Sequence, residues 1–234
     1  MSPLTPKTGS LRAVYATVGR GASGSVSAHV HHVRTDRCVI VPGMNKNESR
    51  SLWQGKLVRL RAIEPGDWET YFAWDFDDQQ TRALYFIPFP KSREAARRWV
   101  EQESTRPIGD DNRRFTIARV ADDAVVGDIT VHDADPRVGT FTYGVAIKRE
   151  DQRKGYASEA IRLLLRYYFQ ERRYQKVTVT FYSFNEASIG LHEGLGFHRE
   201  GRLRRMVYTN GAYHDHLLYG LTVEEFREKH LASM

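Results

Sequence analysis

The feature that most constrains this chain is a strand-like segment that leads, through a turn with a glycine, into a long helix-like segment. Residues 139–147 are rich in β-branched and aromatic side chains, which is typical of a strand. Beyond the turn, apolar residues recur every three or four positions, which predicts an amphipathic helix from about Gly155 to Arg172. The turn itself consists of Gln152, Arg153, Lys154, Gly155, Tyr156 and Ala157.

A turn of this kind favours the binding of an anion. The first N–H groups of a helix have no partner within the helix, and the helix dipole adds positive potential at the same end. Gly155 allows a ligand to approach the backbone closely, and the small Ala157 keeps the first helical turn accessible. The string matches neither the Walker loop nor the dinucleotide fingerprint. Taken alone, it is equally compatible with an ordinary turn before a surface helix.

The rest of the ordered region alternates between strand-like and helix-like segments. Helices are predicted around Trp68–Trp74, with Asp67 as N-cap, and from Ser92 onward. The other predicted elements are strands 56–61, 114–120, 125–131, 176–182, 197–208 and 212–221 and a short helix 186–195. Asn210-Gly211 predicts a type I′ hairpin turn between the last two strands. This order predicts one α+β, or mixed α/β, domain.

The first part of the chain has a different composition. It is rich in Gly, Ser, Thr, Val and His, and residues 1–43 carry a net charge of +4 out of +6 for the whole chain. We interpret residues 1–50 as a flexible extension, or as the product of a start codon upstream of Met44, and residues 51–230 as the domain. Without the extension the charge is nearly balanced, so we expect no specific binding of nucleic acid.

Two simple counts narrow the class of protein further. No stretch approaches the roughly 20 apolar residues that span a bilayer, so no membrane segment is expected. Cys38 is the single cysteine, which excludes an intramolecular disulfide and is consistent with a cytoplasmic location.

Several motifs in one order resemble the GNAT superfamily of N-acetyltransferases, in particular its ribosomal-protein N-terminal and spermidine N-acetyltransferases. The resemblance covers about residues 53–222. Its signature is Q/R-x-x-G-x-G/A after the fourth strand, matched by the turn at Gln152–Ala157. The other matching segments are Tyr143–Ile147, Ala157–Ala160, Asn185–Ser188, Leu195–Phe197, Glu200-Gly201 and Asn210–Tyr213.

The resemblance implies a splayed, mostly antiparallel sheet flanked by helices, with acetyl-CoA between the fourth and fifth strands. It implies that the pantetheine pairs with the backbone at Val145, Ala146 and Ile147 and that the pyrophosphate meets the turn. The cofactor-binding residues it implies are Val145, Ala146, Ile147, Gln152, Arg153, Lys154, Gly155, Tyr156, Ala157, Asn185 and Ser188. Asn185 also suits the N-cap of the following helix, and both roles are compatible.

The catalytic positions depart from the family pattern. The backbone N–H of Ile147 is implied as the oxyanion donor. His192 stands where many relatives have a tyrosine that acts as general acid, and an imidazolium could donate a proton in its place. Thr142 stands where relatives often have a glutamate base, and it cannot serve as one. His132, Asp133 and Glu103 are alternative bases, so the base stays unassigned.

The acceptor is expected to be a small-molecule amine or a peptide N-terminus. The segment expected to line its cleft contains the aromatic residues Tyr85, Phe86 and Phe89, which favours an acceptor with apolar character over a free polyamine. His214 and His216 share one face of a predicted strand, but without a third ligand we expect no metal site.

The sequence therefore predicts an acetyl-CoA-dependent N-acetyltransferase that transfers an acetyl group to a primary amine by direct attack in a ternary complex. The alternative is a CoA-binding protein of the same fold without transferase activity. Related folds often form homodimers, but the pattern does not decide the oligomeric state.

Overall fold

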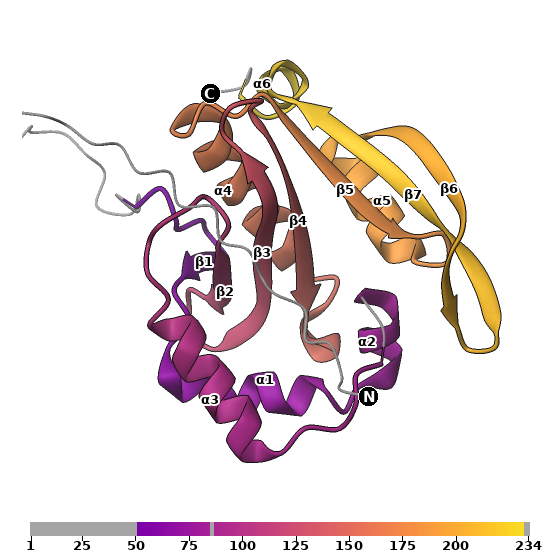
Figure 1. Cartoon of the computed structure of the whole chain (residues 1–234). Helices are drawn as coiled ribbons and strands as arrows, with labels where there is room; N and C mark the ends of the chain where they lie inside the picture. Colours follow the sequence, from indigo (N-terminus) through magenta and orange to yellow (C-terminus); the bar gives the residue numbers. More distant parts are fainter. Residues whose placement is uncertain (1–50, 85–86, 232–234) are drawn as a thin grey trace, which may run out of the picture. The chain divides into compact units, whose positions relative to one another are not determined.

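A seven-stranded sheet with the order β1-β2-β3-β4-β5-β7-β6 forms the framework of this computed structural model (Figure 1). All neighbouring strands are antiparallel except β4 and β5. The structure describes residues 51–84 and 87–231. The predicted extension at residues 1–50 therefore lies outside the described residues. The prediction of a mixed α/β, mostly antiparallel fold is confirmed.

The regular elements follow the predicted order with two additions. The strands are β1 (Val58–Arg61), β2 (Arg114–Arg119), β3 (Val125–Asp135), β4 (Thr140–Ile147), β5 (Lys176–Tyr182), β6 (His198–Thr209) and β7 (Ala212–Thr222). The helices are α1 (Trp68–Trp74), α2 (Asp78–Leu84), α3 (Arg93–Ser104), α4 (Tyr156–Gln170), α5 (Glu186–Leu195) and α6 (Val223–His230), with 3-10 turns at Pro65–Asp67 and Arg149–Asp151. Helices α2 and α6 were not predicted.

Capping and turn residues explain why most of the observed elements match the predicted ones. Ser92 caps α3 as predicted, because its hydroxyl accepts the N–H of Ala95 at 3.1 Å. Asn210 and Gly211 have φ of 50° and 77°, which confirms the type I′ turn. Asp67 is the N-cap residue of α1 as predicted, but its side chain makes no capping hydrogen bond to that helix. Its carboxylate instead accepts both guanidinium NH groups of Arg61 at 2.8 Å and the N–H of Glu64, so no oxygen caps α1.

Different helices cover the two faces of the sheet. Helix α4 buries Ile161, Leu164 and Leu165 completely in the main core against the sheet. Helices α1 and α3 form a second, smaller core on the other face, where the hydroxyl of Tyr71 lies 3.2 Å from that of Thr116 in β2. Because side chains alternate along a strand, every second residue of β2, β3 and β4 faces away from α4.

The sheet opens between β4 and β5. The two strands pair only from Thr140 to Thr142, opposite residues 176–178, and then diverge (Figure 1). After Thr142, the backbone of β4 on the side that faces β5 pairs with no strand. A main-chain edge without a neighbouring strand offers hydrogen-bonding groups to a ligand.

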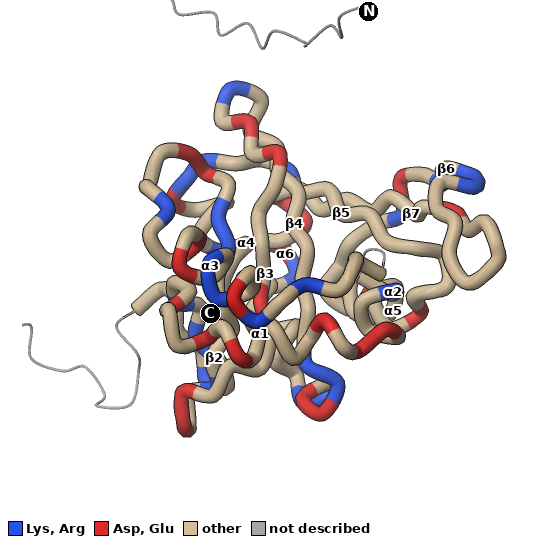
Figure 2. Tube along the Cα trace, turned by 60° about the horizontal axis from the view of Figure 1, so that its bottom comes forward, with Lys and Arg blue, Asp and Glu red and all other residues tan. Residues whose placement is uncertain are grey.

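Positively and negatively charged residues are interspersed along most of the described chain (Figure 2). The clearest local excess of positive charge lies in β6, which includes Arg204 and Arg205. None of the helices among the described residues is both long enough and apolar enough to cross a membrane.

Candidate active site

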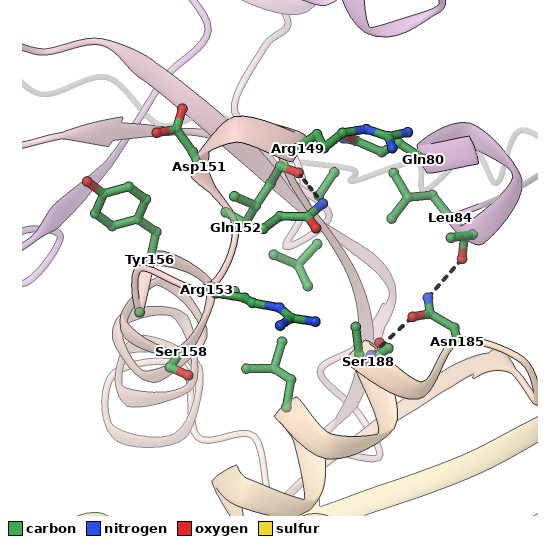
Figure 3. Close-up of a pocket in the computed structure, with 18 of the residues that line it drawn as sticks. Gln80, Leu84, Arg149, Asp151, Gln152, Arg153, Tyr156, Ser158, Asn185 and Ser188 are labelled. Carbon is green, nitrogen blue, oxygen red and sulfur yellow. Dashed lines mark hydrogen bonds between the residues drawn. The ribbon is translucent and has the colours of Figure 1, made fainter. Parts of the chain in front are cut away.

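A cavity of about 520 Å³ lies where β4 and β5 diverge. It is bounded by the end of β4, the turn before α4, the first residues of α4 and α5, and helix α2 (Figure 3). Its size is within the usual range for small-molecule sites. The structure brings together ten of the eleven predicted cofactor-binding residues here: Val145, Ala146, Ile147, Gln152, Arg153, Gly155, Tyr156, Ala157, Asn185 and Ser188. Lys154 does not line the cavity, because its Nζ is paired with Asp151 at 2.8 Å.

The end of β4 presents free backbone groups to this cavity. The N–H of Lys148 donates to the carbonyl of Val126 on β3 at 2.9 Å. Residues of an antiparallel strand bond to the same neighbour at every second position, so Val145 and Ile147 direct their N–H and C=O groups away from β3. The carbonyl of Ile147 accepts Nε2 of Gln152 at 3.1 Å on that side. The N–H groups of Val145 and Ile147 therefore point toward the open edge.

The turn before α4 is held in a conformation that exposes its backbone. Gly155 has φ of +84° and Arg153 has φ of +61°, both in the left-handed region. A Cβ on Gly155 would also lie 3.3 Å from Cδ1 of Leu57, so a side chain there is disfavoured twice. The buried Asp151 holds the turn together through Lys154 and through Arg119 at 3.5 Å.

The positive charges around the cavity differ in how freely they can reach a ligand. The side chain of Arg153 extends across the cavity toward α5 (Figure 3). Arg149 also lines the cavity, but its guanidinium is paired with Asp77 and with Oε1 of Gln79 at 2.7 Å. Arg153 is thus the better placed of the two to meet an anionic group, since Arg149 is held by α2 and the residue before it.

Asn185 has the predicted capping role. Its side-chain oxygen accepts the N–H of Ser188 at 3.1 Å, and its amide group donates to the carbonyl of Ala83 at 3.0 Å. One side chain therefore starts α5 and ties it to the end of α2. Helix α2 contributes Gln79, Gln80, Ala83 and Leu84 to the cavity. Leu84 begins the segment that was expected to line the acceptor cleft, and the other three were not predicted. Helix α2 has no buried residue, and its sequence therefore lacks the regular spacing of apolar residues that would have predicted a helix.

His192 lies beside the cavity rather than in its lining. The side chain is 2% exposed and packs between the rings of Tyr143, Phe181 and Phe197. Nδ1 donates to the carbonyl of Ser188 at 2.7 Å, and Nε2 has no partner among the described residues. Burial lowers the pKa of His192 to about 4, so the ring is neutral at pH 7. Its role as general acid stays a prediction based on position in the motif.

Of the predicted acceptor residues, the structure describes Phe89 alone, and Phe89 does not line the cavity. Tyr85 and Phe86 lie outside the described residues, and Phe89 is 95% exposed and away from the lining. His214 and His216 pack against aromatic rings of the chain, Phe184 and Tyr182 respectively. In the part of the chain that the structure describes, no group of three His, Cys, Asp or Glu side chains is placed to hold a metal ion.

Comparisons with known proteins agree on one family. The model of the GNAT acetyltransferase domain matches residues 58–198. The SPbeta prophage-derived uncharacterized N-acetyltransferase YokL of Bacillus subtilis (strain 168) is 42% identical over 178 residues, which are 76% of this chain and 97% of that protein. A second protein of that strain, provisionally named the ribosomal N-acetyltransferase YdaF, is 29% identical over 171 residues, which are 72% and 93% of the two chains.

Solved structures show the same fold. The spermidine N-acetyltransferase from Vibrio cholerae, in complex with CoA and spermine, has a TM-score of 0.63 and is 20% identical over 72% of this chain and 97% of that one. A GCN5-related N-acetyltransferase from Brucella melitensis has a TM-score of 0.63 and is 23% identical over 76% and 81%. At these identities the likeness concerns the fold alone.

Proposed function

Because this chain belongs to the GNAT acetyltransferase family, we propose that its cavity binds acetyl-CoA and that the enzyme transfers the acetyl group to a primary amine by direct attack in a ternary complex. The observation that carries the proposal is the meeting of a free β4 edge and an exposed helix N-terminus at one cavity. The first suits the amide-bearing pantetheine arm and the second suits a pyrophosphate.

Each cavity element has a part in this proposal. The N–H groups at the start of α4 and the guanidinium of Arg153 bind the phosphates, and the free groups of Val145 pair with the pantetheine amides. The N–H of Ile147 then donates to the thioester carbonyl oxygen, which becomes an oxyanion when the amine attacks. Holding amine and thioester together supplies a large part of the acceleration.

The acceptor in this proposal is a protein N-terminus or a small-molecule amine. The cavity wall formed by α2 is uncharged, with Gln80, Ala83 and Leu84 at its surface. A polyamine would carry several positive charges into this wall, and their desolvation would be costly without nearby carboxylates. An acceptor with one amine and an apolar neighbour fits the wall better.

A mass-spectrometric screen tests the proposal. The full chain is incubated with acetyl-CoA and a panel of spermidine, an aminoglycoside and peptides with N-terminal Ala or Ser, and each amine is examined for a gain of one acetyl group. We expect at least one amine to be acetylated. CoA binding without acetylation of any amine would favour the alternative, a CoA-binding protein without transferase activity, for which the neutral His192 and Thr142 give a reason.

A double substitution tests the cofactor site separately. Gly155→Glu with Ala157→Glu adds two carboxylates at the anion site and forces a side chain into the left-handed region, so we expect CoA affinity to fall at least about 100-fold. The matched control, Gly109→Glu with Ala121→Glu, adds the same charge at exposed positions outside the cavity. Retained CoA affinity in the first variant, measured by calorimetry, would exclude this turn as the phosphate site.

A further inference from the structure

The face of the sheet that is turned away from α4 has an opening at Gly144. A Cβ built on Gly144 would have one heavy atom within 4 Å among the described residues, Nε2 of His132, at 4.0 Å. Gly144 directly precedes Val145, which lines the cavity, and it lies beyond the last residue of β4 that pairs with β5. The missing side chain therefore leaves room next to the free edge of β4 where a small group can reach the backbone.

His132 occupies this face from the neighbouring strand. It pairs with Thr142, and the alternation along β3 and β4 places the side chains of His132, Thr142 and Gly144 on the same face. The hydroxyl of Thr142 donates to the carbonyl of His132 at 3.4 Å, which leaves the ring free of that contact. His132 is exposed, and its ring forms no hydrogen bond within residues 51–84 and 87–231.

The other carboxylates near this face are occupied. Asp128 is buried and paired with Arg114, and Glu103 lies 3.9 Å from the same guanidinium. Burial raises the pKa of Asp128, but its side chain is enclosed and paired with Arg114, so it is not open to an acceptor. Asp133 follows His132 with φ of +48° at an irregularity of the β3–β4 register, so regular alternation ends at His132. His132 is the last residue of β3 in register with β4 before this irregularity, and its ring nitrogen lies next to the opening at Gly144.

We propose that His132 is the general base of the acetyl transfer, taking a proton from the acceptor amine over the opening at Gly144. This inference rests on the proposed function and names the group that the sequence left unassigned. The acceptor enters over the sheet face that carries His132 and Thr142, and the thioester reaches the same point along the free edge of β4.

In the proposed acetyl transfer, two protons leave the acceptor nitrogen. The acceptor arrives as an ammonium ion, and Nε2 of His132 takes one proton from it, directly or through one water molecule. The free amine attacks the thioester carbonyl carbon, a C–N bond forms, and the second N–H proton is lost as the tetrahedral intermediate collapses. The C–S bond breaks, the sulfur takes up a proton, and His132 returns its own proton to solvent. The products are the N-acetyl amine, CoA and one proton.

Charges around the ring favour this role at neutral pH. Partial burial, followed by the positive charge of Arg114 on β2, lowers the pKa of His132 below its usual value, against the opposing effect of Asp133 and Asp128 on β3. The β4 residues that face the ring, Thr142 and Gly144, carry no titratable group. His132 is therefore neutral, and able to accept a proton, throughout the range above its lowered pKa.

The test compares His132→Gln with the wild-type full chain, using acetyl-CoA and the N-terminal-Ala peptide, spermidine and aminoglycoside of the screen. At pH 7 we expect kcat/KM to fall about 100-fold or more with unchanged CoA affinity. For the wild type, kcat/KM should rise with pH around the lowered pKa of His132. For the variant, this rise should be absent. Added imidazole should restore part of its rate. His198→Gln, which removes an exposed imidazole at the start of β6, is the matched control.

Outcomes for the base and for the proposed function are distinct. If His132→Gln keeps its kcat/KM within about threefold and keeps the same pH profile, His132 is not the base, although acetyl transfer itself stands. If the rate falls but the rise with pH persists and imidazole gives no rescue, the residue acts through structure and the proposal fails. If the wild-type chain acetylates no amine, the base and the proposed function fall together.

Discussion

The turn before α4 and the hairpin formed by β6 and β7 are built in opposite ways. The turn is fastened from several directions, by Asp151 to Lys154, by Gln152 to the carbonyl of Ile147, and by close packing of Gly155 against Leu57. The hairpin exposes large apolar side chains along much of its length. Leu203, Met206, Tyr208 and Tyr213 are each between 45% and 63% exposed.

This difference separates a turn whose backbone is held in place from a surface that is open to substitution. A rigid anion site loses little entropy when its ligand binds, and its shape follows from the ligand's phosphates and amides. Exposed apolar side chains can change by substitution at little cost in stability. The turn that we propose as the phosphate site is thus fixed by the backbone, whereas the surface of the hairpin is set by its exposed side chains.

The largest expected effect concerns the fastening of the turn. Glu159 in the first turn of α4 accepts the N–H groups of Lys56, Leu57 and Val58 at 2.9, 2.7 and 2.7 Å. Glu159→Ala leaves three donors without an acceptor, so we expect the free energy of unfolding to fall by about 2–4 kcal/mol in urea titrations. CoA affinity should fall as well, because Glu159 lies in the first turn of α4, next to the proposed phosphate site.

Glu171→Ala is the matched control for that change. Glu171 is exposed at the other end of α4, and its removal should change the free energy of unfolding by less than about 0.5 kcal/mol. A loss of under 1 kcal/mol in Glu159→Ala would show that the cofactor side is no more firmly fastened than the rest of the surface.

The second prediction uses the buried imidazole of His192. Its folded pKa is about 4 and that of an unfolded histidine is about 6.5, so the unfolded chain binds the extra proton as the pH falls. Stability should therefore drop by about 3 kcal/mol between pH 6.5 and pH 4, beyond the change shown by His192→Phe. Denaturant unfolding across this range measures the difference, with His198→Phe as the control for loss of an imidazole.

The same variant tests the general-acid prediction. If His192→Phe keeps the wild-type turnover and pH–rate profile at neutral pH, the residue has no part in proton transfer. A flat difference in stability between pH 6.5 and pH 4 would show instead that the ring is charged in the folded state.

A smaller effect is expected where α5 meets α2. Asn185→Ala removes both the cap and the bond to the carbonyl of Ala83, and should cost about 1–2 kcal/mol. Asn185→Ser keeps a capping hydroxyl but loses the bond to α2, so it should recover most of the stability while CoA binding reports on the position of α2. Equal losses in the two variants, by thermal unfolding, would assign the stability to the α2 contact.

The smallest effect is expected on the acceptor side. Phe89 is almost fully exposed, so Phe89→Ser should change the free energy of unfolding by less than about 0.5 kcal/mol and leave CoA affinity unchanged. If this ring contacts the acceptor, KM for the acetylated amine should rise while kcat stays constant. A loss of stability above 1 kcal/mol would show that Phe89 packs against the domain and is not a free surface residue.

The sequence predicted those helices and strands in which apolar residues recur at regular spacing. β5 and α5 begin and end at the predicted residues, and α4 differs by one or two residues at each end. Helix α6 was missed although its capping box, Thr222 with Glu225, was a readable signal. Helix α2 carried no such signal, because it is polar all round and exists through its contacts at either end.

What the sequence by itself determined is the turn that we propose as the phosphate site, because a strand, a left-handed glycine and a helix N-terminus follow one another within about 20 residues and need no distant partner. Only the tertiary structure decided what surrounds it. Glu159 reaches donors about 100 residues away, and His132 meets the opening at Gly144 because β3 and β4 pair in one register. A sequence pattern records local periods, whereas contacts of this kind depend on how the strands are aligned.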